Sequence, residues 1–171
     1  MRNVQRLLFL LLIFASSSCA VSSIRHLQGQ PDKRLERLEH ERAHLKTLTD
    51  PVDRTKSDIT ISEILLSLAG DAVRSGEPEL LQKRLGEYVD AIEDAHQALA
   101  KAGRDAHKKP KGFKDLEIVL RRQIRTLDDI GKGLTFDQRE PVDKAKQQAS
   151  DIRDDLLKAL FGEQNAPSHK T

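Results

Sequence analysis

The stretch that decides the fold runs from position 81 to position 106 and reads LQKRLGEYVDAIEDAHQALAKAGRDA. Its apolar residues are separated by alternating steps of four and three positions, the period of a helix edge that is buried against another helix. The residues concerned are Leu81, Leu85, Tyr88, Ile92, Ala95, Leu99, Ala102 and Ala106. The pattern predicts a long amphipathic helix that needs a partner helix.

Four further segments carry apolar residues at helical spacing. One is a wide stripe suited to burial between two neighbours, formed by Ile61, Ile64, Leu65, Leu68, Ala69 and Ala72. The others are a seam of Val142, Ala145, Ala149, Ile152, Leu156 and Leu160, a helix marked by Leu116, Leu120, Ile124 and Leu127, and a weaker one with Leu35, Leu38, Leu45 and Leu48. We therefore expect an all-α chain, an antiparallel bundle of five helices arranged as helical hairpins over residues 32–162.

Proline and glycine indicate where these helices begin and end, because proline suits a first helical turn and glycine suits the position after a last one. The expected starts are Asp50-Pro51, Glu77-Pro78 and Glu140-Pro141, and the expected stops are Gly76, Gly103, Gly131, Gly133 and Gly162. Residues 109–112 form the clearest loop. Aromatic residues make up only 4% of the chain and charged residues 33%, which favours helices with polar surfaces over β-sandwiches or barrels.

The first 20 residues have the order of a secretory signal peptide. Arg2 and Arg6 precede an apolar run, LLFLLLIFA at positions 7–15, and small residues follow it. A membrane-spanning helix needs roughly 20 apolar residues, so this run is too short to span a bilayer. We expect residues 1–20 to be removed on export, residues 21–31 to form a polar tether and residues 163–171 to form a disordered tail.

Cys19 is the only cysteine, so the chain cannot form an intrachain disulfide. The run Ser16-Ser17-Ser18-Cys19 resembles the bacterial lipobox, in which a cysteine after small residues is acylated and becomes the mature N-terminus. The resemblance implies a lipid anchor at Cys19. Ordinary cleavage after Ala20 is the alternative, with Ser18 and Ala20 as the small pair that a signal peptidase requires. Either interpretation exports the chain to the periplasm, to the outer membrane as a lipoprotein, or to the extracellular space.

One catalytic motif occurs in the sequence, HERAH at positions 40–44, on a predicted helix. Two imidazoles four residues apart share one helix face and could bind zinc, with Glu41 as the general base for a bound water. Glu63 follows His44 after 18 intervening residues, a spacing that resembles gluzincin-type zinc peptidases, where a glutamate supplies the third ligand. The resemblance implies a zinc site formed by His40, His44 and Glu63.

The residues around this motif favour a solvated helix instead. Arg42 lies inside the motif and Lys46 follows it, where such peptidases carry uncharged and hydrophobic residues. A mature chain of about 150 residues also offers little material for a substrate cleft on both sides of a metal. We therefore favour no metal, no cofactor and no catalytic residue, with a zinc-dependent hydrolase as the alternative.

Positive charge is concentrated in one region of the chain. Residues 101–125 hold nine basic and three acidic residues, although beyond residue 20 the totals are 27 of each. The candidate anion-binding residues are Lys108, Lys109, Lys111, Lys114, Arg121, Arg122 and Arg125. They predict either a solvated or internally paired face, or a surface that docks an acidic partner, a glycan or lipid headgroups. Only one aromatic, Phe113, lies among them, so specific nucleic-acid binding is not expected.

The sequence contains no phosphate-binding loop, nucleophile elbow or dinucleotide fingerprint. We expect an exported cell-envelope protein that acts as a non-catalytic interaction or scaffold module. Its partner would be another envelope protein or an anionic surface, and a lipid anchor at Cys19 would be its attachment to a membrane. A regular helix seam can also be satisfied between copies, which leaves a homo-oligomer open. The alternative functions are the zinc-dependent hydrolase and a basic module for anionic polymers or lipid headgroups.

Overall fold

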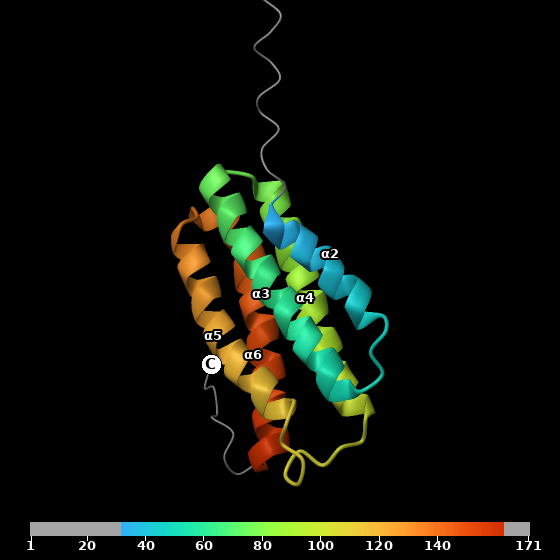
Figure 1. Cartoon of the computed structure of the whole chain (residues 1–171). Helices are drawn as coiled ribbons and strands as arrows, with labels where there is room; N and C mark the ends of the chain where they lie inside the picture. The colour runs from blue at the N-terminus through green and yellow to red at the C-terminus, as the bar shows by residue number, and fades with distance from the viewer. Residues whose placement is uncertain (1–31, 163–171) are drawn as a thin grey trace, which may run out of the picture. The chain divides into compact units, whose positions relative to one another are not determined.

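The structure is a computed structural model that describes residues 32–162 (Figure 1). Over this range the chain forms five α-helices and one short 3₁₀-helix, and it contains no β-strand. The elements are α2 (Lys33–Leu45), α3 (Pro51–Ser75), α4 (Pro78–Lys101), α5 (Phe113–Lys132), η1 (Phe136–Gln138) and α6 (Glu140–Phe161). The all-α prediction with five helices is confirmed. The expected signal peptide (1–20), Cys19, the tether (21–31) and the tail (163–171) lie outside the described residues.

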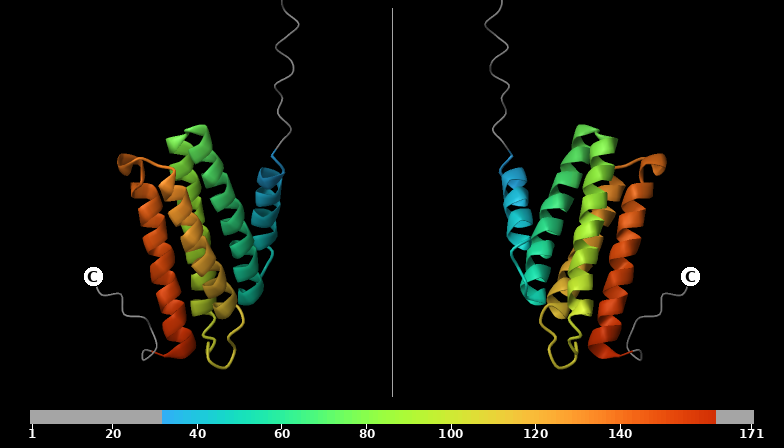
Figure 2. Two further views of the ribbon diagram at one scale, coloured as in Figure 1. Left: turned by 90° about the vertical axis from the view of Figure 1, so that its left-hand side faces the viewer. Right: turned by 90° about the vertical axis from the view of Figure 1, so that its right-hand side faces the viewer.

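Neighbouring helices in the chain run in opposite directions and form two hairpins (Figure 1). The first hairpin consists of α3 and α4, and the second consists of α5 and α6. Helix α2 packs on α3 at one flank, and α6 contacts both α4 and α5 at the other (Figure 2). The loop of residues 102–112, which joins the hairpins, projects from the end of the bundle opposite the turn at Gly76 (Figure 2).

The apolar positions predicted from the helical period form the core. Every residue of the predicted stripe on α3 and of the predicted seam on α6 is buried, as are the seam residues of α4 from Leu81 to Leu99. Burying one such leucine contributes about 1.5 to 3 kcal/mol. The short helix α2 fits its pattern less well, because Leu38 is fully buried whereas Leu35 is 39% exposed. The core therefore holds α3 to α6 together, and α2 is attached by fewer apolar side chains.

The helix ends follow the predicted punctuation with two corrections. The Asp50 side chain caps α3 by accepting hydrogen bonds from the backbone N–H of Val52 (2.9 Å) and Asp53 (3.1 Å), and Gly76 ends α3 in the left-handed conformation. The predicted stop at Gly131 is wrong, since α5 continues to Lys132. The predicted seam beyond Leu99 is also wrong, because α4 ends at Lys101, Ala102 is exposed, and the buried Ala106 lies in the following loop.

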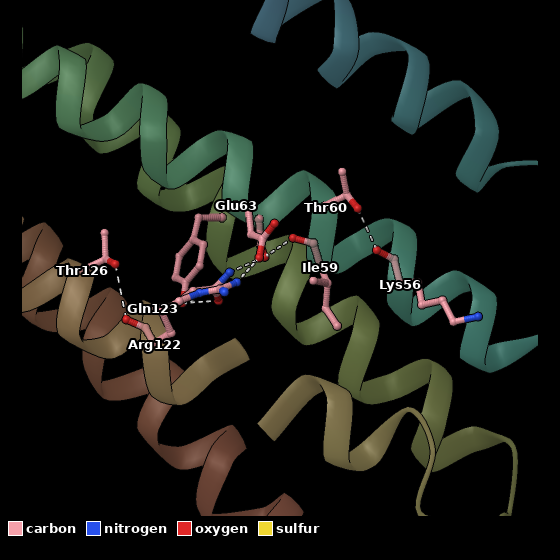
Figure 3. A network of polar contacts seen from close by, with 9 residues as sticks. Lys56, Ile59, Thr60, Glu63, Arg122, Gln123 and Thr126 are labelled. Atoms are coloured by element: carbon pink, nitrogen blue, oxygen red, sulfur yellow. Dashed lines mark hydrogen bonds and ion pairs between the residues drawn. The ribbon is translucent and has the colours of Figure 1, made fainter. Parts of the chain in front are cut away.

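A buried chain of hydrogen bonds fixes three helices relative to one another (Figure 3). The Tyr88 hydroxyl on α4 donates to Gln123 Oε1 on α5 at 3.3 Å, and Gln123 Nε2 donates to Ser62 Oγ on α3 at 2.7 Å. Ser62 Oγ in turn donates to the carbonyl oxygen of Ile59 at 2.8 Å. Burial also raises the pKa of the Tyr88 phenol, which keeps it a neutral donor. This chain gives the core a polar link that only one helix register satisfies.

Candidate functional site

The motif at positions 40–44 lies on α2, and both of its imidazoles are on the exposed surface. His40 and His44 are exposed, one turn apart. Glu41 is half-buried, and its Oε2 accepts a hydrogen bond from the Ser57 hydroxyl on α3 at 3.1 Å. The side chain considered as a general base thus takes part in packing α2 on α3.

The structure does not bring Glu63 to the two histidines. Glu63 lies on α3 and forms an ion pair with Arg122 on α5 (Figure 3). Ser57, which faces α2, and Glu63, which faces α5, are about 120° apart around α3. Within residues 32–162 no group of three histidine, cysteine, aspartate or glutamate side chains is placed to hold a metal ion.

The predicted anion-binding residues divide into two sets. Three of them form ion pairs within the chain: Lys108 with Asp105 at 3.6 Å, Arg121 with Glu117 at 2.6 Å, and Arg122 with Glu63. The other four, Lys109, Lys111, Lys114 and Arg125, are exposed and have no ion pair with any described residue. The cations that remain available are therefore those of the loop and of one face of α5.

Glu117 on α5 joins the two helices of the second hairpin. Its side chain is 5% exposed, and its carboxylate accepts hydrogen bonds from Arg121 on α5 (2.6 and 2.8 Å) and from Arg153 on α6 (3.0 Å). A buried carboxylate is tolerated when it is paired and hydrogen-bonded in this way. The contact stabilises the α5–α6 pairing, so Arg121 has a structural role.

Asp58 on α3 is a buried carboxyl group with an unsatisfied atom. The residue is 1% exposed and its Oδ2 has no hydrogen-bond partner among the described residues. Burial and, to a smaller extent, repulsion by Asp94 on α4 raise the pKa of Asp58, attraction to Arg54 lowers it, and the net result is a pKa of about 7. Asp58 is therefore neutral in acid and loses its proton near neutral pH.

The described chain has a groove between α4 and α6, with a volume of about 750 Å³. The end of α3, the turn into α4 and the segment around η1 close one end of it. Along α4 its lining residues extend from Pro78 to Glu93, which corresponds to about 22 Å of helix. The groove is thus elongated along α4.

The rim of this groove is acidic. It contains Glu77, Glu79, Asp90, Glu93, Asp137 and Glu140, and Lys144 is the one basic lining residue. Glu93 accepts a hydrogen bond from Gln148 at 3.3 Å, and the other five acids have no ion pair within residues 32–162. Outside the groove some acids of the described chain are paired, for example Asp53 with Lys56 and Asp128 with Lys146, and others, such as Asp143 and Asp151, have no ion pair. The groove therefore concentrates negative charge that the described chain leaves uncompensated.

The helix N-termini explain only part of this charge. Glu79 and Glu140 lie in first turns, where a carboxylate stabilises the positive end of the helix dipole. Asp90 and Glu93 lie more than three turns into α4, where the dipole no longer has that effect. Asp137 lies in the first turn of η1. Local helix chemistry therefore gives no reason for the acids at Asp90 and Glu93.

The floor of the groove is apolar but already covered. Leu81, Leu85 and Val89 of α4 line it and are only 3%, 2% and 9% exposed. Gly86 lies between them, and a Cβ built there would have no atom within 4 Å. Glycine in a helix interior costs about 0.5 to 1 kcal/mol relative to alanine, and no contact in the described chain requires it at this position.

An exposed aromatic stands at the edge of the groove. Phe136 in η1 is 89% exposed and directly precedes the lining residues Asp137 and Gln138. The turn that carries it is held by two hydrogen bonds between Thr135 and Gln138, one from the Thr135 backbone N–H to Gln138 Oε1 (3.4 Å) and one from the Gln138 N–H to the Thr135 carbonyl (3.1 Å). The ring is therefore presented by a fixed turn.

This groove is not predicted from the sequence, in which Glu77-Pro78 and Glu140-Pro141 indicate only helix starts. In an antiparallel bundle alternate helices begin at the same end, so the starts of α4 and α6 come together there (Figure 1). The excess of acids in residues 20–100, 15 against 11 basic residues, was the available signal.

Searches with protein-family models, curated protein sequences and solved structures find no match to this chain. No helix in the described part of the chain is long and apolar enough to cross a membrane.

Proposed function

We propose that this chain is an exported, non-catalytic interaction module of the cell envelope, and that the groove between α4 and α6 is its binding surface. The observation that carries the proposal is the unpaired acidic rim at Asp90 and Asp137. Uncompensated charge of one sign along a concave surface attracts a ligand of the opposite sign and speeds its association. The export part of the proposal rests on the leader-like residues 1–20.

Crosslinking in cells that export the protein tests the binding surface. A photoreactive amino acid replaces Gln82, an exposed residue of the groove, and in a control it replaces Ala100, an exposed residue of α4 outside the groove. We expect a discrete adduct from position 82 and none from position 100. We also expect Asp90→Lys with Asp137→Lys to abolish that adduct. Equal adducts from both positions, or an adduct that survives the charge reversal, would contradict the proposal.

Mass measurement of the exported protein tests its processing. Cleavage before an acylated Cys19 and cleavage after Ala20 give products of different mass, and each supports export. Recovery of the chain from the cytosol with its first residues intact would contradict export.

A second function is supported by the cations of α5 and the preceding loop. Lys114 and Arg125 are eleven residues apart and lie on the same side of the helix, and the 49% exposed Ile118 lies between them. With Lys109 and Lys111 they form a basic face that carries an exposed apolar side chain, a combination suited to an anionic polymer or to lipid headgroups. Binding to anionic vesicles that weakens with salt and with Lys109→Glu and Lys111→Glu would support this function. Binding that ignores both changes would contradict it.

A further inference from the structure

The acidic groove begins at one end of the described bundle, and the basic loop lies at the other end. At one end of α3, Val52 Cγ2 is 3.4 Å from a Cβ built on Gly112, the last residue of the loop. At its other end, Gly76 lines the groove. Along α4 the groove extends as far as Glu93, eight residues or about 12 Å of helix from Lys101, the last residue before the loop, and no loop cation pairs with a groove acid within the described residues.

The loop has a defined conformation and is held to the core by buried residues. Asp105 Oδ1 accepts hydrogen bonds from the backbone N–H of His107 (2.9 Å) and Lys108 (3.3 Å). Ala106 and Phe113 are each 6% exposed and hold the loop against the core. Figure 2 shows the loop projecting beyond the helices. The unpaired Lys109 and Lys111 therefore lie on a projecting loop, whereas the unpaired acids line a recess.

The groove favours a polar, positively charged occupant over an apolar one. Leu81, Leu85 and Val89 in its floor are already covered by the helices' own packing, so these three residues offer little apolar surface to an amphipathic helix. Lysine side chains are attracted by the unpaired acids of the rim and do not need exposed apolar surface beneath them. Their aliphatic stems can lie along the open surface at Gly86.

From these observations we infer that the groove binds the basic loop and the start of α5 of a second copy of this chain, with Lys109, Lys111 and Lys114 facing Asp90, Glu93 and Asp137. The inference rests on the proposed function, since it uses the same groove, and it names the occupant. A contact between two different surfaces leaves one free groove and one free loop on each dimer. The copies therefore add head to tail, and chains grow unless their rotation closes a ring.

The association is dominated by charge and depends on salt. Exposed charges interact over about 10 Å at 0.1 M salt but over only about 3 Å at 1 M. We expect the mass of the full-length purified chain in sedimentation to rise with concentration at low salt and to return to that of the monomer at high salt.

Charge exchange between the two surfaces is the decisive experiment. One variant reverses the groove with Asp90→Lys and Asp137→Lys, and another reverses the loop with Lys109→Glu and Lys111→Glu. Each variant alone places like charges opposite one another, which weakens self-association at least ~10-fold. An equimolar mixture restores complementary junctions, and association returns. The control Glu36→Lys with Asp151→Lys changes charge at exposed sites outside the groove and leaves assembly unchanged.

An uncharged substitution distinguishes steric blocking of the groove from an effect of changed net charge. Gly86→Gln fills an exposed position in the groove and leaves the net charge unchanged. It reduces assembly at least ~10-fold if the loop enters the groove, and circular dichroism checks that helix content is retained. Association that persists in Gly86→Gln, or that fails to return on mixing the two reversed variants, would overturn the inference. A position-82 adduct with a different protein or with another polymer would also overturn it and leave the proposed function intact, whereas loss of every groove adduct would remove both.

Discussion

Replacement of Asp58 by asparagine removes the one buried carboxyl group of the bundle whose pKa is raised to about 7. In the unfolded chain this group titrates near 3.8, so between these values the folded state holds a proton that the unfolded state has lost. The contribution of Asp58 to stability therefore falls as pH rises from about 4 to about 7, and it is constant above that. Three pH units at 1.36 kcal/mol each set an upper bound of about 4 kcal/mol.

The variant Asp58→Asn lacks this titration, so the comparison with the wild type isolates it. Asparagine brings its own cost, because a buried amide without a partner costs about 1 to 3 kcal/mol, but that cost does not depend on pH. We expect the free energy of unfolding of the variant, relative to the wild type, to rise by about 2 to 3 kcal/mol between about pH 5 and about pH 8. All other titrating groups are common to both proteins and cancel.

Urea unfolding followed by far-ultraviolet circular dichroism measures this difference at each pH. Asp94→Asn is a matched test of the second cause, since it removes the charge that repels Asp58 and should narrow the pH effect without abolishing it. Parallel pH profiles for the wild type and Asp58→Asn would refute the reasoning, because a carboxyl group with an ordinary pKa cannot produce a stability difference in this range.

The remaining predictions concern backbone freedom and buried polar contacts, and each is measured by urea unfolding. Gly112→Ala should lower the free energy of unfolding by more than about 1 kcal/mol, because Gly112 has φ +88° and a Cβ there would lie 2.8 Å from a leucine side chain of α4. Gly86→Ala should raise the free energy of unfolding by about 0.5 to 1 kcal/mol, because alanine suits a helix interior better than glycine. Equal effects of the two changes would contradict this reasoning. Gln123→Leu should lower the free energy of unfolding by about 1 to 3 kcal/mol, because it leaves the Tyr88 hydroxyl unpaired. Adding Tyr88→Phe removes that unpaired hydroxyl and should recover part of the loss. Strictly additive losses in the double variant would contradict a contribution of the hydrogen bond. Glu117→Gln should cost about 1.5 to 3 kcal/mol by weakening charged hydrogen bonds between α5 and α6, and an unchanged unfolding midpoint would show that this contact is dispensable.

The helical period of the sequence predicts most of the buried positions, because an amphipathic helix buries the face on which its apolar residues recur. On α6 and α3 every predicted apolar position is buried. The failures occur where backbone conformation overrides the period. Gly103, with φ +59°, follows the end of α4 and directs the chain away from the seam before Ala106. Gly131 stays helical, and a Cβ built there would lie 3.7 Å from Val142 of α6, an ordinary contact distance, so this glycine does not end the helix and an alanine would fit in its place.

The candidate site was less accessible from sequence, because it depends on which helix faces meet. Spacing alone suggested that Glu63 joins His40 and His44, but α3 contacts α2 and α5 on different sides, and Glu63 lies on the side toward Arg122. Charge density correctly marked residues 101–125 as basic, yet only tertiary structure separates the paired Arg121 from the unpaired Lys109. The groove acids come from three separate elements, so no single window of sequence contains them.

Two similar helix starts show how one residue can change the use of a local motif. The segments DPVD at positions 50–53 and EPVD at positions 140–143 both begin helices, and both place a buried valine in the first turn. The shorter Asp50 side chain is consumed in capping α3, because its Oδ1 accepts two backbone hydrogen bonds. Glu140 lies inside α6, and its carboxylate has neither a capping bond nor an ion pair within the described residues. An acid that does not cap its helix remains available at the surface, and at this end of the bundle that surface is the groove.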